Sequence, residues 1–555
     1  MPDRPRMRPG AGAEARQGAS PPALAALAAL CLASAIVVVV LGTRLTFFND
    51  EWYVLLLRPG VSAHTLLDPH NGHLSLIPVA VYKALVAIFG LDNQLPFRLA
   101  LAAVIVSLGV MVFVFVRARC GDLLALLTAA IVLLLGPAWQ DLLWSFQIGL
   151  VGSLVTGIGV LLALERGTRR ADLAACALLI ASIALSNLGI PFVIAAAVVV
   201  LLRRRPADAW IAGVPAVLFA VWWLAYGRGD ETGFSLANVA RTPFYVLDSI
   251  AAALASLSGL STDVGGAPDA YSWGRPLLVL AFLGVAAWVV RGGRPPRAAL
   301  PIAAAAMSWW ILLGIDFLPN WREPDTSRYQ LISVTFLILL AAETFRGFRL
   351  RSNAAAATAT ALVIVIVGAN LGPLKDGYDF FRDQSTIARA DLGALDIGRG
   401  QISPRFRLLQ PIAGSIYMTG IYAGPYYRER DAHGSPAYSA SEIAAASPPA
   451  RDAADVVLAS AYSLHLEALS ETPSESCHTI GDASGAVALG TGTLRLSNRS
   501  QVPADAMLRR FGDGYPVDLG ELPPGRSALL SIPADRGGTP WELEAPGVAV
   551  GRCGT

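Results

Sequence analysis

An acidic pair stands close to the end of the first strongly apolar segment of the chain. Residues 23–42 are almost entirely apolar, and Asp50 and Glu51 follow a few positions later, with Trp52 directly after them. A carboxylate can accept a proton from a reacting hydroxyl group when it is held in the right position. An acidic pair just outside a first membrane span therefore indicates a site at the membrane surface rather than a simple anchor.

A second polar motif precedes a much later apolar segment. Ser327-Arg328-Tyr329 introduces the apolar residues 331–343, after a loop rich in acids, arginines and aromatic side chains. A third polar loop contains Gln140 and Asp141. Charged and aromatic side chains are common wherever spans meet water, so each residue alone has an ordinary explanation. A common site requires that the three loops lie on the same side of the membrane.

Three histidines also lie in the first polar loop. They are His64, His70 and His73, and on a helix His70 and His73 would share one face. A divalent metal ion held by them together with Asp50 is one hypothesis. Two histidines without a third fixed ligand are more typical of solvated or capping side chains. We therefore expect a site that requires no metal or other cofactor.

The composition excludes an ordinary soluble protein. Of the 555 residues, 54% are hydrophobic and 15% are charged, and the mean hydropathy is +0.53. Repeated apolar stretches of about 20 residues are typical of membrane spans. Residues 1–22 are rich in Pro, Gly, Ala and Arg, which predicts a disordered N-terminus. The expected partner is a lipid bilayer and not a nucleic acid.

Twelve apolar segments follow one another, and the second of them decides the topology. If residues 74–89 rest on the outer surface without crossing, 14 arginines fall in cytoplasmic loops and 5 in outer loops downstream of Arg98; a crossing would exchange the two numbers. Arginines in short loops are retained on the cytoplasmic side. A crossing would also place Lys83 near the bilayer centre, at a cost of about 2.5–3.5 kcal/mol. The segments are residues 23–42, 74–89, 97–116, 123–138, 148–164, 173–185, 190–202, 209–226, 276–290, 298–315, 331–343 and 354–371.

The predicted fold class is an all-α polytopic membrane protein. We expect about 11 transmembrane helices in residues 23–372, with a surface helix in the first outer loop. The N-terminus (residues 1–22) would be cytoplasmic, in the plasma (inner) membrane. Residues 173–202 are short for two full spans, so they form either a helical hairpin or two half-helices that dip into the membrane.

The C-terminal region, residues 373–555, differs in composition from the apolar segments before it. It is polar and contains many Gly and Pro residues, and we expect an extracytoplasmic α+β or β-rich domain. Strands are predicted at residues 455–459, 485–490, 493–497 and 527–532. Cys477 and Cys553 lie in this region. In an oxidising compartment they are candidates for a disulfide bond.

The pattern resembles the GT-C superfamily of polyprenyl-phosphate-sugar-dependent glycosyltransferases, which includes protein O-mannosyltransferases and the arabinose transferases that act on lipid A. The resemblance covers about residues 23–345. It rests on the pair Asp50-Glu51, on Arg98 opening a span, on Arg328-Tyr329 opening a late one, and on the stretch from His70 to Leu74 before a surface helix. Relatives often have His-Pro-Pro at that stretch, where this chain has His70-Asn71-Gly72-His73.

The resemblance implies a reaction and a role for each candidate residue. The donor would be a sugar on a polyprenyl phosphate, whose phosphate is a good leaving group, so that no general acid is needed. Asp50, or Glu51 if the register differs by one, would take the acceptor proton. Arg328 would hold the phosphate through two hydrogen bonds. Tyr329 and Trp52 would stack on the sugar or line the lipid groove, and His70, His73 and Arg98 would complete the substrate site.

Three functional hypotheses follow. The first is an inverting membrane glycosyltransferase that moves a hexosyl or pentosyl group to a lipid, glycan or protein acceptor outside the cytoplasm. The second is a transporter or flippase for a lipid-linked glycan, although several spans contain no charged residue that would face an interior pathway. The third is a non-catalytic scaffold for the cell envelope.

Overall fold

The computed structural model describes residues 19–229, 234–261, 273–319, 321–408, 421–469, 477–483 and 485–553. The chain divides into two compact units. Unit 1 contains Met1–Thr43, Gly60–Lys83 and Leu95–Asp379, and unit 2 contains Arg44–Pro59, Ala84–Gln94 and Phe380–Thr555. Most of the expected disordered segment, residues 1–22, lies outside the described residues.

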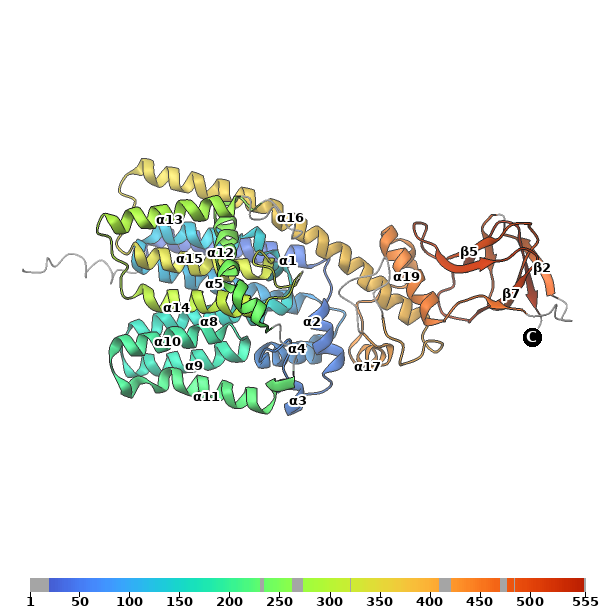
Figure 1. The fold of residues 1–555 in the computed structure, drawn as a ribbon, viewed down its shortest axis with the longest axis horizontal. Helices are drawn as coiled ribbons and strands as arrows, with labels where there is room; N and C mark the ends of the chain where they lie inside the picture. Colours follow the sequence, from blue (N-terminus) through green and yellow to red (C-terminus); the bar gives the residue numbers. More distant parts are fainter. Residues whose placement is uncertain are drawn as a thin grey trace, which may run out of the picture. The chain divides into compact units, whose positions relative to one another are not determined.

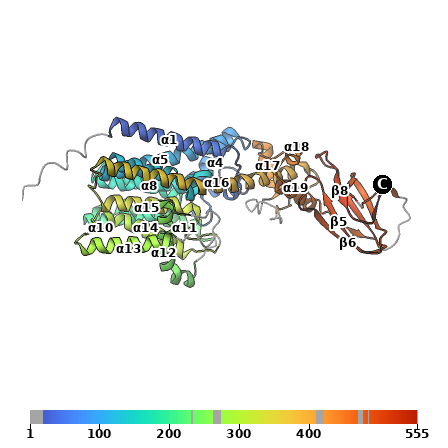
Figure 2. The same cartoon turned by 90° about the horizontal axis from the view of Figure 1, so that it is seen from above.

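Unit 1 is a bundle of helices, most of which run side by side (Figures 1 and 2). The chain is apolar enough that these helices bury side chains against one another and expose apolar surface outward, as expected in lipid. The helices are α1 (Pro21–Gly42), α3 (Ala63–Leu67), α4 (Leu76–Phe89), α5 (Leu95–Cys120), α6 (Asp122–Leu133), η3 (Gly136–Ala138), α7 (Trp139–Leu143), η4 (Ser145–Gln147), α8 (Ile148–Glu165), α9 (Arg169–Leu185), α10 (Gly189–Arg203), η5 (Pro206–Asp208), α11 (Trp210–Ala225), η6 (Gly227–Gly229), α12 (Leu236–Ser258), α13 (Gly274–Val290), α14 (Ala299–Ile315), α15 (Ser327–Thr344) and α16 (Asn353–Ile397). The last residues of α4 and of α16 belong to unit 2.

Five stretches among the described residues are long and apolar enough to cross a bilayer. They are Pro21–Gly42, Leu95–Cys120, Ser145–Glu165, Pro206–Ala225 and Asn353–Ile397. A sixth results if Asp122–Leu133 and Gly136–Leu143, which are bent by 44° at their break, form one span. Helices α4, α10, α13 and α14 are apolar but shorter. The mostly helical membrane architecture is confirmed, and the number of eleven spans stays a prediction.

The segment at residues 173–202 is a pair of helices joined by a short turn. Helix α9 has 17 residues and α10 has 15, and Ser186, Asn187 and Leu188 connect them. Ser153 of α8 and Ser182 of α9 hydrogen-bond through their hydroxyl groups at 2.8 Å. Such polar contacts between small side chains are a common way to join helices in a membrane.

Helix α12 was not anticipated from the sequence. It has 23 residues, begins at an N-cap where the Ser235 side chain accepts a hydrogen bond from the Asn238 N–H, and carries Pro243 inside it. Its buried residues recur at helical spacing, and polar residues such as Asn238, Arg241 and Asp248 interrupt its apolar runs. A search for long apolar runs overlooks such an amphipathic helix, because its apolar residues occupy only one face.

Small residues let the helices of unit 1 approach closely. A Cβ atom on Gly157 of α8 would lie 2.1 Å from the Phe192 ring of α10. That ring in turn lies 5.6 Å from the Phe336 ring of α15, centroid to centroid. Any side chain at position 157 would therefore have to displace Phe192. Glycine at such contacts is typical of helix packing in membranes.

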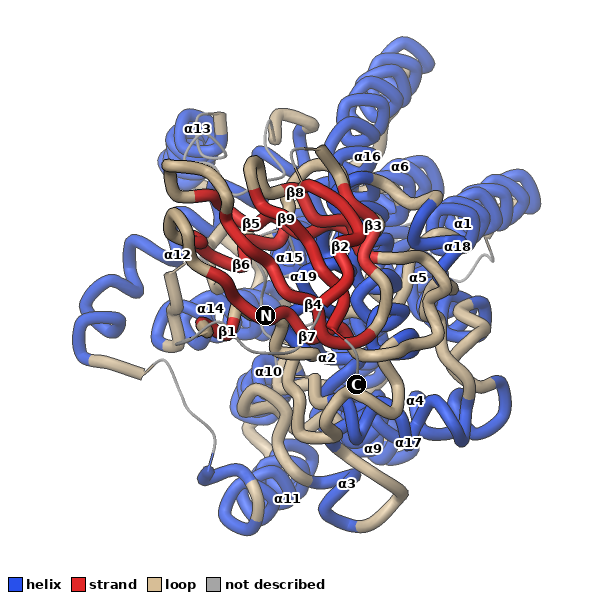
Figure 3. The backbone as a smooth tube through the Cα atoms, turned by 90° about the vertical axis from the view of Figure 1, so that its right-hand side faces the viewer, coloured by secondary structure: helices blue, strands red, loops and turns tan. Residues whose placement is uncertain are grey.

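Unit 2 contains short helices and two β-sheets (Figure 3). One sheet has the strand order β1-β7-β4-β9-β2 and the other β3-β8-β5-β6, and all of the described strand pairs are antiparallel. The elements are α2 (Asn49–Trp52), η2 (Tyr53–Leu57), α17 (Ala423–His433), α18 (Ala440–Ala444), α19 (Pro448–Ala461), β1 (Glu467–Ala468), β2 (Cys477–Asp482), β3 (Val487–Leu489), β4 (Gly492–Asn498), β5 (Ala504–Arg509), β6 (Val517–Leu522), β7 (Ser527–Ile532), β8 (Trp541–Glu544) and β9 (Val548–Cys553).

The β-rich nature of the C-terminal region is confirmed, with one element corrected. The expected strands at residues 485–490, 493–497 and 527–532 correspond to β3, β4 and β7. The expected strand at residues 455–459 is wrong, because these residues belong to helix α19. A short apolar run cannot by itself distinguish a buried strand from a buried helix. Here two prolines at the start of α19 and several alanines favour the helix.

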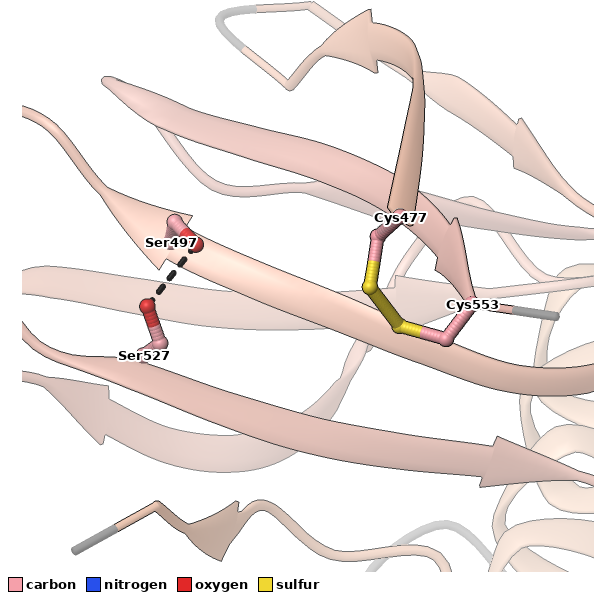
Figure 4. Close-up of a disulfide and its surroundings, with 4 residues drawn as sticks. All are labelled: Cys477, Ser497, Ser527 and Cys553. Atoms are coloured by element: carbon pink, nitrogen blue, oxygen red, sulfur yellow. Dashed lines mark hydrogen bonds between the residues drawn. A yellow bond between two sulfur atoms is a disulfide. The ribbon is translucent and has the colours of Figure 1, made fainter. Parts of the chain in front are cut away.

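A disulfide bond joins Cys477 and Cys553 (Figure 4), as predicted. The two residues are direct partners in the register of β2 and β9, and their Cα atoms are 4.2 Å apart. A second cross-strand contact nearby is the 2.8 Å hydrogen bond between Ser497 of β4 and Ser527 of β7. The disulfide therefore holds an edge strand onto the five-stranded sheet.

Candidate active site

The acidic pair lies on the short helix α2 in unit 2, and the two carboxylates have different surroundings. The Phe48 N–H donates to Glu51 Oε2 at 2.7 Å, and the Glu51 N–H donates to the Phe48 carbonyl at 2.7 Å. Glu51 is fully buried, whereas Asp50 is half-buried. Because the Glu51 carboxylate caps the helix that carries Asp50, the geometry favours Asp50 as the group available for chemistry.

The residues around the pair form a small core of their own. The Trp52 indole donates to the Phe47 carbonyl at 2.9 Å, and its ring is buried against the Phe47 ring. The Thr46 N–H donates to Ser385 Oγ of α16 at 3.0 Å, and Phe48 lies against Phe381 at 4.5 Å. Trp52 thus packs inside the loop, and its proposed contact with sugar or lipid stays a prediction.

The stretch from His70 to His73 is a tight turn in unit 1 and not a helix. The backbone groups of His70 and His73 exchange hydrogen bonds of 3.0 and 2.9 Å, and Asn71 and Gly72 both have positive φ. Asn-Gly is the preferred pair for such a two-residue turn. The Asn187 side chain donates to the Gly72 carbonyl at 2.9 Å. The hypothesis that His70 and His73 share a helix face is therefore wrong.

The rings of this turn lie among aromatic neighbours. His70 is 5% exposed, and its ring meets the Phe146 ring edge-on at 5.4 Å. The described residues contain no group of three or more His, Cys, Asp or Glu side chains arranged to hold a metal ion. A substrate contact by His70 or His73 stays a prediction, while the observed contacts fix the turn.

Arg98 has a positioning role in unit 1. It is 1% exposed, and its guanidinium donates to the Leu143 carbonyl at the end of α7. Gly42 of α1 makes room for it, because a Cβ there would lie 2.7 Å from Arg98 Cδ. Arg98 therefore holds α7 against α1 and α5. A direct contact of Arg98 with substrate stays a prediction.

The beginning of α15 meets α7 at two hydrogen bonds. The Gln140 N–H donates to Ser327 Oγ at 3.0 Å, and the Arg328 N–H donates to Gln140 Oε1 at 3.3 Å. Arg328 is half-buried; its guanidinium donates to the Trp321 carbonyl at 2.8 Å and lies 5.3 Å from the Tyr329 ring centre. The Tyr329 ring in turn packs edge-on against Trp309 at 5.8 Å. These contacts present an arginine at the positive end of an 18-residue helix.

Asp141 is the residue whose importance the sequence did not reveal. It is completely buried, and neither carboxylate oxygen has a hydrogen-bond partner among the described residues. Burial works against a negative charge on this group, and the nearby charge of Arg328 offsets that effect only in part. Buried carboxylates are normally hydrogen-bonded, and an exception marks a candidate functional site. A signal was present in the sequence, because an acid next to Gln140 interrupts an otherwise apolar and aromatic stretch, residues 138–144.

We call Gln140, Asp141, Ser327, Arg328 and Tyr329 the α7–α15 site. An arginine at a helix N-terminus is a strong ligand for phosphate, because the guanidinium forms paired hydrogen bonds and the helix dipole adds to its charge. Among the described residues the guanidinium donates to the Trp321 carbonyl and not to Asp141, so Asp141 acts on it only through the electric field. Of the predicted residues, Arg328 and Tyr329 belong to this site. Asp50, Glu51 and Trp52 belong to unit 2, so their meeting with Arg328 stays a prediction.

No family model and no curated protein match the chain. Two solved structures are similar to it. The structure of ArnT from Cupriavidus metallidurans bound to undecaprenyl phosphate has a TM-score of 0.43 and 16% sequence identity, and the match covers 72% of this chain and 84% of that one. The apo structure of the same ArnT has a TM-score of 0.45 and 14% identity, over 73% and 85% of the two chains. The similarity concerns the backbone fold alone. The chemistry of this chain therefore rests on the residues described above.

Proposed function

We propose that this protein is a GT-C-type membrane glycosyltransferase that moves a sugar from a polyprenyl-phosphate donor to an extracytoplasmic acceptor. The observation that carries the proposal is the α7–α15 site, where a fully buried carboxylate without a hydrogen-bond partner lies in the field of Arg328. An arginine at a helix N-terminus, near a buried carboxyl group, is suited to a phosphate that gains charge during reaction.

In the proposed reaction Arg328 binds the donor phosphate, and Asp50 acts as the general base. The acceptor oxygen attacks the anomeric carbon while the bond from that carbon to the phosphate oxygen breaks. The electron pair of the broken bond leaves with the phosphate, whose added charge Arg328 stabilises. The acceptor proton passes to Asp50. Attack opposite to the leaving phosphate inverts the anomeric centre.

Asp141 is a positioning residue in this scheme. Its carboxyl group lies in the field of Arg328 without a hydrogen bond to it among the described residues, so its proposed influence on the guanidinium is electrostatic. Replacement of this interaction by the phosphate requires no reorganisation of α15, because Gln140 and Ser327 already hold the start of that helix. Preorganised charge of this kind contributes more to catalysis than charge that must be ordered during the reaction.

The proposed topology places the N-terminus in the cytoplasm and residues 373–555 outside it. Helix α4 has only 14 residues, fewer than the about 20 that span the hydrocarbon core, which supports a surface position for it. The Cys477–Cys553 disulfide supports an oxidising, extracytoplasmic setting for the C-terminal region. On this topology the acidic pair and the α7–α15 site share the outer side.

The decisive experiment is a transfer assay with the full-length protein in membranes and a panel of polyprenyl-phosphate sugars. Undecaprenyl phosphate, which the similar ArnT structure holds, is the first carrier to test. Asp50→Asn should lower transfer by about 10²–10⁴-fold, the usual contribution of a general base. Asp68→Asn is the matched control, since Asp68 lies in the same outer loop and pairs locally with His64 at 3.1 Å.

Each alternative function predicts a different result. A flippase would move the lipid-linked sugar across vesicles without forming a new glycosidic bond, and Asp50→Asn would leave that movement intact. A scaffold would give neither transfer nor lipid movement with any donor. Full transfer activity of the Asp50→Asn protein would remove Asp50 from the mechanism.

A further inference from the structure

A cleft opens at the arginine-rich end of the helix bundle in unit 1. It has a volume of about 260 Å³ and lies between the last turns of α5, α8 and α10 and the beginning of α14. Eight of its twelve lining residues are apolar, among them Leu161, Leu202 and Ile302. Sugars and nucleotides need polar groups along the walls of their sites. Apolar walls with a few charged groups suit an amphiphile instead.

Of the four charged residues that line the cleft, three are neutralised within the protein. Arg119 forms ion pairs with Glu165 and Glu343. Arg203 pairs with Asp172 at 2.9 Å and with Asp208 at 3.5 Å.

Arg297 is different. It is exposed, and its side chain makes no hydrogen bond or ion pair with any described residue. It lies just before Ala298, the N-cap residue of α14, and the positive end of that helix adds to its charge. The mouth of the cleft therefore carries a positive charge without a protein partner.

The surroundings of the cleft are positive as well. In the described loops at this end of the bundle, each of the five acidic residues pairs with Arg117, Arg119, Arg203 or Arg346. Ten arginines there have no acidic partner among the described residues: Arg166, Arg169, Arg170, Arg204, Arg205, Arg291, Arg294, Arg297, Arg349 and Arg351. This excess favours an anionic ligand and opposes one that brings its own ammonium group.

The apolar wall is open toward the outside of the bundle. Leu202 is 42% exposed, and Leu201 beside it is 73% exposed, whereas Leu161 and Ile302 deeper in the cleft are buried. An acyl chain can therefore enter along Leu202 and cover apolar surface inside. A headgroup phosphate at the mouth then reaches Arg297.

We propose that this cleft binds one anionic glycerophospholipid, with its phosphate against Arg297 and the beginning of α14 and with an acyl chain against Leu202 and Leu161. Phosphatidylglycerol has the required chemistry, because its headgroup adds no positive charge. Basic pockets between membrane helices are known to accept such headgroups. The proposal is independent of the proposed function, and only the name of the leaflet, the cytoplasmic one, rests on the proposed topology.

The test uses the full-length protein, stripped of lipid in a mild detergent. Dioleoyl phosphatidylglycerol and dioleoyl phosphatidylcholine are titrated separately, bound lipids are counted by native mass spectrometry, and thermal melting is followed. We expect one tightly bound phosphatidylglycerol per chain and a rise in melting temperature that phosphatidylcholine does not produce. Arg297→Gln should weaken phosphatidylglycerol binding about fivefold.

Two further variants separate a built site from diffuse attraction. Arg351→Gln is the charge-matched control, since Arg351 is an unpaired arginine at the same end that does not line the cleft, and it should leave binding unchanged. Ala298→Phe keeps every charge but fills the cleft, and it should abolish the tight binding of one lipid. Loss of binding in Arg297→Gln and Ala298→Phe with retention in Arg351→Gln would support the site.

Three outcomes would overturn the proposal. Equal affinity for the two phospholipids would show an ordinary lipid contact. Equal weakening by Arg297→Gln and Arg351→Gln would show attraction by the whole basic surface. Displacement of phosphatidylglycerol by an equal concentration of undecaprenyl phosphate would assign the cleft to a polyprenyl carrier instead.

Discussion

Two buried carboxylates lie near opposite ends of helix α15, and they differ in their hydrogen bonds. Glu343, near the end of the helix, is 1% exposed and receives hydrogen bonds from both Arg119 and Arg346. Asp141, beside the beginning of the helix, is 0% exposed and receives none from the described residues. Both have an arginine nearby, so the difference lies in the hydrogen bonds and not in the presence of opposite charge.

We infer from this difference that Glu343 serves structure and that Asp141 serves function. A buried charge that is fully hydrogen-bonded costs a great deal to break, because its partner is left uncompensated. A buried charge with unused hydrogen-bond capacity costs stability in the resting protein. Such a cost persists in a protein only where the group has another use, and chemistry is the most common one. We therefore predict a structural role for the end of α15 and a functional role for its beginning.

The largest effect on stability should come from Glu343→Gln. The substitution leaves the buried Arg119 with Glu165 as its remaining carboxylate, so we expect the free energy of unfolding to fall by about 3 kcal/mol. Denaturation of the purified protein in detergent measures this. Transfer activity per folded molecule should stay unchanged. A selective loss of activity would contradict a purely structural role for Glu343.

The largest effect on activity within the α7–α15 site should come from Asp141→Asn. Loss of the charge that positions Arg328 should lower kcat/KM by about 10²-fold. The melting temperature should stay the same or rise, because a buried carboxyl group without hydrogen bonds is replaced by a neutral amide. A strong loss of stability would show instead that Asp141 is a structural residue like Glu343.

Arg328→Lys tests the phosphate contact with the charge retained. Lysine cannot form the paired hydrogen bonds of a guanidinium, and we expect kcat/KM to fall about tenfold, equivalent to about 1.4 kcal/mol. Arg241→Lys is the control, because Arg241 is an exposed arginine on α12 outside the site. Steady-state kinetics with a soluble short-chain donor measures both, and equal values for the two variants would remove Arg328 from the site.

A third buried acid, in unit 2, extends the comparison to a region in water. Burial, the largest single effect, would raise the pKa of Asp535. Hydrogen bonds from Arg510, the Gly537 N–H and Tyr462, together with the charge of Arg510, outweigh it and hold the pKa below its usual value. The unfolded chain then binds the proton more readily than the folded one. The stabilisation is therefore complete above about pH 4, the usual pKa of an aspartate, and is lost as the pH falls through the lowered value.

Because solvent screens part of this interaction, we expect a loss of about 1 kcal/mol on acidification. Thermal melts at about pH 5 and about pH 3 should show this loss in the wild type and a smaller one in Asp535→Asn. Identical pH dependence of the two proteins would show that the Arg510 pair adds nothing.

The smallest effect should come from Arg346→Gln. Arg346 also donates to Glu343, at 2.8 and 3.0 Å, but its side chain is 49% exposed. Exposed ion pairs contribute little, so the expected loss is about 0.5 kcal/mol. A loss as large as that of Glu343→Gln would mean that exposure does not decide the strength of these pairs.

Sequence periodicity and composition predicted much of this architecture. The long apolar helices, the β-rich C-terminal region and the Cys477–Cys553 pair follow from runs of residues and their spacing, because these features depend on local patterns. The helix at residues 448–461 and the amphipathic helix α12 were not recovered, because short or one-sided apolar patterns suit more than one structure. The turn at His70-Asn71-Gly72-His73 was considered as a helix although Asn-Gly favours a turn.

The sequence by itself determined the kinds of groups in the candidate site: carboxylates near a membrane surface, an arginine before a late span and aromatic neighbours. Only the tertiary structure decided which carboxylate lacks partners. Glu51 accepts a hydrogen bond from the backbone of its own helix cap, and Glu343 accepts hydrogen bonds from two arginines. Asp141 accepts none from the described residues. The physical reason is that hydrogen-bond satisfaction depends on side chains brought together from distant parts of the chain, and no local pattern of residues records that.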